Sequence, residues 1–167
     1  MRNVVALVFG LLVSFGFAFE SVRGADSQEL NRIKGLVGTW TGEVDHGNGP
    51  EKVTLVYRVT AGGSAVVETY NPGSSMEMVT VYHDRDGKLE LTHYCMLGNQ
   101  PRLKLTGSSD KSVSLELAKD SDIEKDEMHM CALTIEFESE DKIKQIWSMN
   151  MDGKRTKGPA VELTRKP

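Results

Sequence analysis

LVGTWTG, residues Leu36–Gly42, is the most informative part of the sequence for the fold, because its Gly-x-Trp triplet opens a strand-like segment immediately after a short predicted helix. That helix takes Asp26 or Ser27 as its N-cap and ends at Gly35. Beyond the stretch, apolar residues tend to recur at every second position, which is the period of a strand. The sequence therefore predicts a short helix followed by an all-β domain.

Ten strand-like segments rich in Val, Thr, Leu, Ile and Tyr follow one another between turn signals. Turn sequences such as Asn71–Gly73 and Met151–Gly153 favour hairpins between consecutive segments. An open sheet of ten strands would leave two exposed edges, and closure removes them. We therefore expect one antiparallel meander β-barrel, with a two-sheet sandwich as the alternative. The predicted strands are 38–46, 52–60, 64–70, 76–83, 88–96, 101–106, 112–118, 129–137, 142–150 and 159–165.

The first residues have the pattern of a signal peptide spanning residues 1–24. A basic start precedes the uncharged apolar run Val4–Phe19, and the small residues Val22 and Gly24 suit cleavage after Gly24. The run is short for a membrane span, so we expect no stable membrane insertion after cleavage, with an uncleaved anchor as the alternative. The sequence therefore predicts one exported domain, residues 25–167, in the periplasm or secreted.

The charge balance argues against nucleic acid as a partner. The chain of 167 residues carries 20 Lys and Arg against 24 Asp and Glu, and without the signal peptide the balance is 18 against 23, a net charge of −5. Basic residues are interleaved with acidic ones along the predicted strands, whereas binding to a phosphate backbone needs a basic face. Nothing in the sequence indicates the oligomeric state.

The chain resembles the calycin superfamily of lipocalins, fatty-acid-binding proteins and nitrobindins. In these proteins a Gly-x-Trp opens the first strand after a short helix, and a basic residue of the last strand covers the tryptophan. Gly38 and Trp40 match the first feature, and Arg165 matches the second. The resemblance implies a lipocalin-like barrel in which these three residues are structural, with a cation–π contact between Arg165 and Trp40.

Within that superfamily, the chain is similar to a family of exported bacterial proteins that has no established activity. The similarity is carried by Glu77–His83, Leu91–Cys95 and Gly98–Arg102, and it extends from Leu36 to Arg165. It implies a fold and an export route, and it implies no substrate.

Two His-x-Cys pairs are the candidate ligand or metal residues: His93 with Cys95, and His129 with Cys131. Each pair shares a strand face with apolar residues, so strand parity predicts that all four side chains face the barrel interior. Residues at i and i+2 lie roughly 6.5–7 Å apart, a spacing that suits two ligands of one zinc ion. The two cysteines could instead form a disulfide in an oxidising compartment, or remain free.

Other chemistry has little support in the sequence. Nitrobindin-like barrels bind haem through a histidine near the C-terminus, and no histidine follows His129, so haem is not expected. Standard catalytic signatures are missing, so we assign no catalytic residue and favour a binding protein over an enzyme. Glu68 and Glu77 are isolated carboxylates within strands. An inward carboxylate would have a perturbed pKa, and we expect Glu77 to be solvated.

We therefore expect a barrel that binds one apolar or amphiphilic small molecule inside, with the helix after Asp26 closing one end. The alternatives are a metal-binding protein or enzyme built on the His/Cys cluster, and a structural envelope protein with a filled core. Aromatic and methionine side chains are the candidate cavity lining. They are Tyr57, Tyr70, Met76, Met78, Trp147, Met149 and Met151.

Overall fold

The computed structural model describes residues 24–124 and 126–167. All of the predicted signal peptide except Gly24 lies outside the described residues. Among the residues described, no helix is long and apolar enough to cross a membrane.

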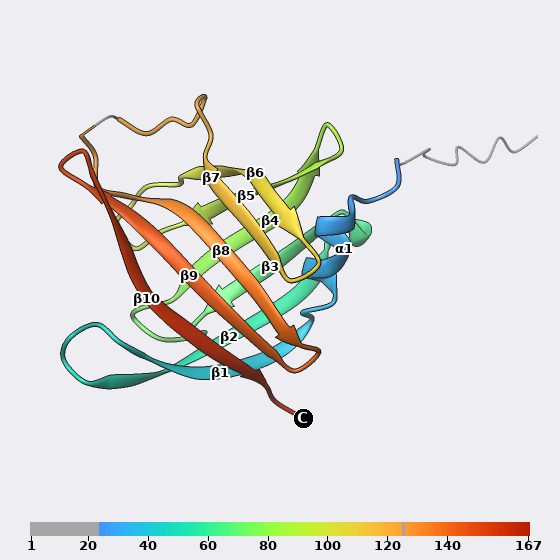
Figure 1. The fold of residues 1–167 in the computed structure, drawn as a ribbon, viewed down its shortest axis with the longest axis horizontal. Coiled ribbons are helices and arrows are strands. Elements are labelled where there is room, and N and C mark those ends of the chain that lie inside the picture. The colour runs from blue at the N-terminus through green and yellow to red at the C-terminus, as the bar shows by residue number, and fades with distance from the viewer. Residues whose placement is uncertain (1–23, 125) are drawn as a thin grey trace, which may run out of the picture.

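The described chain forms one short helix and a closed antiparallel barrel of ten strands, in which each strand pairs with its neighbours in sequence and β1 pairs with β10 (Figure 1). This confirms the predicted fold and excludes the two-sheet sandwich. The elements are α1 (Gln28–Lys34), β1 (Gly38–Asp45), β2 (Pro50–Thr60), β3 (Ala65–Tyr70), β4 (Met78–Arg85), β5 (Lys88–Tyr94), β6 (Arg102–Ser109), β7 (Ser112–Leu117), β8 (His129–Ser139), β9 (Lys142–Met151) and β10 (Lys154–Arg165), with a 3-10 turn at Ala61–Gly63.

The largest difference from the predicted strands is in β10, which begins at Lys154 and not at residue 159. Gly158 and Pro159 look like a break in the sequence, but they lie in a β-bulge where the register with β9 shifts between Lys157 and Ala160. A bulge tolerates proline, because its residue need not donate to the ladder. The strand therefore begins directly after the predicted turn Met151–Gly153 and continues through the bulge to Arg165.

α1 covers one end of the barrel. Ser27 caps the helix, since its hydroxyl accepts a hydrogen bond from the Leu30 amide at 3.0 Å, and Ser27 also bonds to Asp84 at the end of β4. The helix buries Leu30 and Ile33 completely. Their apolar surface stabilises the fold by filling the end of the barrel that the strands alone leave open. The expectation that this helix closes one end is met.

Trp40 and Arg165 lock the same end. The Trp40 side chain is fully buried, and its indole N–H donates to the Leu36 carbonyl at 2.7 Å. The Arg165 guanidinium lies 4.3 Å from the centre of a Trp40 ring, which is the cation–π contact implied by the resemblance to calycins. It also donates to the carbonyls of Gly35 and Val37, so the last strand holds the connection between α1 and β1.

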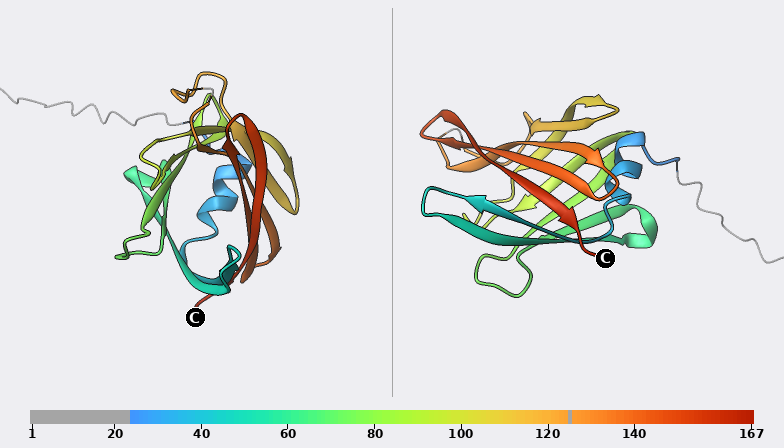
Figure 2. Two further views of the ribbon diagram at one scale, coloured as in Figure 1. Left: turned by 90° about the vertical axis from the view of Figure 1, so that its left-hand side faces the viewer. Right: turned by 60° about the horizontal axis from the view of Figure 1, so that its bottom comes forward.

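The barrel interior has two halves of different character. The closed half, nearest α1, is a filled apolar core, and the open half lies at the ends of the hairpins that join β1 to β2, β3 to β4, β5 to β6 and β9 to β10. Viewed from the open end, the ring of strands has α1 at its far side (Figure 2). The core of the closed half consists of Leu30, Ile33, Leu36, Trp40, Val66, Tyr82, Leu89, Leu91, Leu103, Val113, Leu115, Leu133, Ile135, Ile143 and Leu163.

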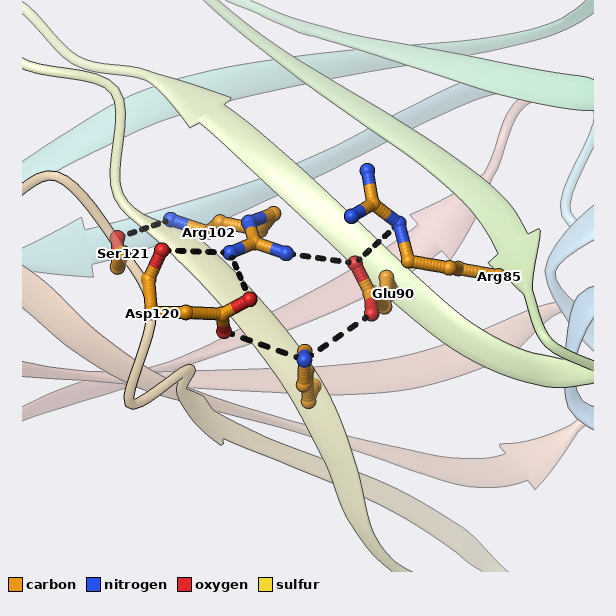
Figure 3. Close-up of polar contacts among 6 residues, drawn as sticks. Arg85, Glu90, Arg102, Asp120 and Ser121 are labelled. Atoms are coloured by element: carbon orange, nitrogen blue, oxygen red, sulfur yellow. Dashed lines mark hydrogen bonds and ion pairs between the residues drawn. The ribbon is translucent and has the colours of Figure 1, made fainter.

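An ion-pair network on the outer wall attaches the segment after β7 to the sheet (Figure 3). Glu90 of β5 lies 3.4 to 3.7 Å from the cationic groups of Arg85, Arg102 and Lys104. Arg102 also pairs with Asp120 at 2.8 Å, and these contacts hold the pKa of the Asp120 carboxyl well below its usual range. Glu90 is only 4% exposed, and the three basic groups around it balance its buried charge.

Candidate ligand cavity

The open half of the barrel contains a cavity of about 350 Å³. Its volume is near the lower end of the range for small-molecule sites, and its walls are mostly apolar. The lining residues come from strands and hairpins around the whole barrel. They are Val44, His46, Leu55, Glu68, Tyr70, Met76, Met78, His93, Cys95, Met96, Leu97, Met130, Gln145, Trp147, Met149, Thr156, Gly158, Pro159 and Val161.

A row of polar side chains crosses the barrel wall at the floor of the cavity. In the strand registers, Tyr57 of β2 is opposite Glu68 of β3, Glu68 is opposite Thr80 of β4, and Thr80 is opposite His93 of β5. Side chains of directly opposed residues point to the same side of a sheet. Because His93 and Glu68 line the cavity, the whole row faces inward, and it separates the cavity from the apolar core.

Glu68 is the centre of this row and is only 3% exposed. The Tyr82 hydroxyl donates to its Oε2 at 2.7 Å, and the Gln145 side-chain amide from β9 donates to the same oxygen at 2.9 Å. The Gln145 amide also donates to the Tyr57 hydroxyl at 2.6 Å. Burial raises the pKa of Glu68, and it raises the pKa values of Tyr57 and Tyr82 well above their usual value, so both hydroxyls keep their protons.

His93 forms the other end of the row. One ring nitrogen, Nδ1, lies 2.9 Å from the Thr80 hydroxyl, and the imidazole contacts Trp147 of β9 with 4.7 Å between ring centroids. Burial lowers the pKa of His93 from 6.5 to about 4, so the ring is neutral at pH 7. His93 therefore offers the cavity a neutral polar group and an aromatic surface.

The apolar walls match much of the lining expected from the sequence. Tyr70, Met76, Met78, Trp147 and Met149 line the cavity. Tyr57 lies beneath it in the polar row, and Met151 is exposed outside it. Methionine side chains are flexible and polarizable, so a wall rich in methionine can adapt to ligands of different shape.

The two His-x-Cys pairs do not meet in the interior, which corrects the parity expectation. His93 and Cys95 line the cavity, whereas His129 and Cys131 do not. The register between β8 and β9 shifts between Met130 and Ala132, so Cys131 is the extra residue of a β-bulge.

The bulge reverses the faces on which the side chains of the first two residues of β8, His129 and Met130, lie. Met130 and its partner Met149 both line the cavity, so His129, one position before, faces outward. His129 is nevertheless buried, and its Nδ1 lies 2.6 Å from the Glu127 carbonyl oxygen. Burial raises the pKa of the Cys131 thiol, and the charges of Arg155 and Glu116, which form an ion pair, have smaller effects on that pKa. His129 therefore lies on the opposite face of the wall from His93 and Cys95, and Cys131 is the bulge residue that does not line the cavity.

Both cysteines are free thiols in the structure. Within residues 24–124 and 126–167, no group of three or more His, Cys, Asp or Glu side chains is arranged to hold a metal ion. The His93 and Cys95 pair thus contributes to the cavity wall, and the donors that a zinc site would need are not assembled around it.

Sequence reasoning did not identify Glu68 as the central polar group of the interior. A signal was present, because Glu68 lies between Val66 and Tyr70 on one face of β3, and both are cavity or core residues. Strand parity applied to this segment places the carboxylate inside. The partners Tyr82 and Gln145 come from other strands, and the fold was needed to find them. Glu77, in contrast, is exposed, as expected.

A second hollow, of about 580 Å³, lies outside the closed end between Arg32 and Arg165. Both guanidinium groups already donate to backbone carbonyls, Arg32 to those of Ser109 and Asp110. These contacts fasten α1 to the barrel, so the hollow belongs to the structural seal of the closed half.

The ten-strand meander barrel is compatible with a calycin-like fold. No protein-family model matches the sequence, and no curated protein shows significant similarity to it.

Proposed function

We propose that the barrel binds one small apolar or amphiphilic molecule in the cavity of its open half. The observation that carries this proposal is the division of the interior: the closed half is packed, while the open half keeps about 350 Å³ free between apolar walls and a polar floor. A cavity with a few convergent polar groups is the usual form of a small-molecule site.

The entrance supports the same proposal. Large apolar side chains at the open end are exposed, and three of them, Met76, Met96 and Leu97, also line the cavity. Exposed apolar groups beside a cavity give an apolar ligand a continuous path from outside to the interior. The remaining exposed apolar residues of this rim are Tyr94, Met128 and Met151.

A neutral dye tests the proposal. N-phenyl-1-naphthylamine fluoresces more strongly in apolar surroundings, and we expect saturable binding of one dye per protein. The substitution Met149→Trp fills part of the cavity and should weaken binding about tenfold or more. Met151→Trp is the matched control, because Met151 is on the same strand but outside the cavity. Absence of dye binding, or equal loss in both variants, would contradict the proposal.

We further propose that binding takes place outside the cytoplasm, in the periplasm or secreted. This rests on the signal-peptide pattern of the first residues, and on the resemblance to exported bacterial lipocalin-like barrels carried by Glu77–His83, Leu91–Cys95 and Gly98–Arg102. N-terminal sequencing of the native protein is expected to start at Ala25. A sequence starting at Met1 in the membrane fraction would reject export with cleavage.

A further inference from the structure

We propose that the cavity selects amphiphiles with a protonated amine head group, and that Glu68 receives this amine at the cavity floor. The inference deepens the proposed function and rests on it. It comes from comparing two glutamates that are equally buried on opposite faces of the barrel wall.

Glu90 and Glu68 are 4% and 3% exposed. On the outer wall, Glu90 is surrounded by Arg85, Arg102 and Lys104 (Figure 3). On the inner wall, Glu68 contacts neutral groups, the hydroxyls of Tyr82 and Tyr57 and the side-chain amide of Gln145. Buried carboxylates are normally paired with a cation, because desolvation of an unpaired charge is costly. Glu90 is paired with cations of the protein itself, whereas Glu68 has only neutral partners and faces the cavity.

The cavity offers no cation of its own to Glu68. Among the described residues that line it, none is Lys or Arg, and the histidine other than His93 is His46, an exposed residue between β1 and β2. His93, the nearest basic group in the polar row, is neutral at pH 7 because burial holds its pKa at about 4. The other titratable groups facing Glu68 are the hydroxyls of Tyr57 and Tyr82, which remain protonated. A cation at this floor therefore has to arrive with the ligand.

An ammonium group suits this floor chemically. It carries three N–H donors, and Glu68 and the Tyr57 hydroxyl offer acceptor oxygens close together. Burial raises the pKa of Glu68 because it disfavours the ionised carboxylate. A bound ammonium has the opposite effect, since its positive charge stabilises the ionised carboxylate. A carboxylate head group would instead bring a second negative charge to a dry site without a counter-ion. A neutral hydroxyl head group should bind with an affinity between those of the amine and the carboxylate.

Three ligands with the same alkyl chain test the selection in the wild-type protein. Decylamine, decanoic acid and decanol are titrated below their aggregation concentrations at pH 7, with displacement of N-phenyl-1-naphthylamine as the readout. We expect decylamine to bind about tenfold or more tighter than decanol, and decanoic acid to bind weakest. Decanoic acid binding as tightly as decylamine, or no displacement by any of the three, overturns the inference.

Two substitutions locate the selection at Glu68. Glu68→Gln removes the negative charge and should reduce the advantage of decylamine over decanol to less than about threefold. Glu90→Gln is the matched control, because it removes an equally buried carboxylate that does not line the cavity, and it should leave the ranking unchanged. Circular dichroism checks that both variants fold. If Glu68→Gln does not fold, Gln145→Lys supplies an internal cation beside Glu68 and should abolish the amine preference.

The two proposals fail in different ways. If the dye binds and Met149→Trp blocks it, but the amine shows no advantage, the cavity binds ligands and the head-group selection is wrong. If the dye does not bind at all, the proposed function is wrong and the selection falls with it.

Discussion

The two tryptophans of the chain mark the difference between the halves of the barrel. Trp40 is fully buried in the closed half, under Arg165 and against the segment that follows α1. Trp147 is partly exposed in the open half, where it lines the cavity and contacts His93. The same residue type thus fills a core in one half and bounds a cavity in the other. The helix-capped end is therefore the packed half of the barrel, and the open end keeps the cavity in which we propose that a ligand binds.

Removal of each tryptophan should give the largest contrast. We expect Trp40→Ala to lower the free energy of unfolding by about 3–5 kcal/mol, because it leaves a large void in a packed core. Trp147→Ala should cost less than half as much, because its ring already borders empty space. Chemical denaturation followed by circular dichroism measures both. Equal losses would show that the two halves are packed alike and would remove the basis of the comparison.

The polar floor between the halves should make stability depend on pH through His93. Its pKa is lowered to about 4 in the folded protein, so the unfolded chain takes up this proton first as the pH falls. The free energy of unfolding should therefore fall between about pH 6.5 and pH 4, with a contribution on the order of 3 kcal/mol. Denaturation of wild type and His93→Gln across this range measures the difference.

Glu68 should act in the opposite direction. Its pKa is raised by burial, so its stabilising contribution is complete below its ordinary value of 4.5 and is lost as the pH rises through the folded value. The difference in unfolding free energy between wild type and Glu68→Gln should therefore shrink with rising pH. A His93 variant with an unchanged pH profile, or a Glu68 variant whose difference grows with pH, would contradict the placement of these groups.

We expect the smallest effect at the two cysteines, of which only Cys95 lines the cavity. Cys95 lines the cavity and is partly exposed, whereas Cys131 is buried and burial raises its thiol pKa. We expect Cys95 to react first with a thiol reagent, and bound N-phenyl-1-naphthylamine to slow it, while Cys131 is unaffected by the dye. Unfolded, unreduced protein should titrate two thiols. A titration of none would show a disulfide between Cys95 and Cys131.

Local sequence rules predicted the elements of this fold well. Ser27 caps α1, the ten strands occur in the expected order, and turns such as Asn71–Gly73 join neighbours. Such features depend on residues close in sequence, where capping, alternation and turn geometry act directly. The contact between Trp40 and Arg165 was also expected, although only through the resemblance to calycins.

The candidate site was predicted less well, and the reason is a bulge. Alternation from Leu133 and Ile135 places Cys131 and His129 inside, but one extra residue in β8 reverses the direction of every side chain before it. A bulge is a property of the pairing between two strands, so alternation within one strand does not reveal it. The pairing of β5 with β4 and β6 has no register shift, and His93 and Cys95 face the cavity as predicted.

The helix, the strands, their hairpin order and a mostly apolar interior could be predicted from the sequence, because they follow from short-range periodicity and turn chemistry. The division of that interior depends on contacts between strands that are distant in sequence. Tyr57, Glu68, Tyr82 and Gln145 come from four strands separated by as many as 88 positions, and closure of the barrel brings them together. The environment of Glu68, on which its pKa and its proposed role depend, exists only once those strands have closed.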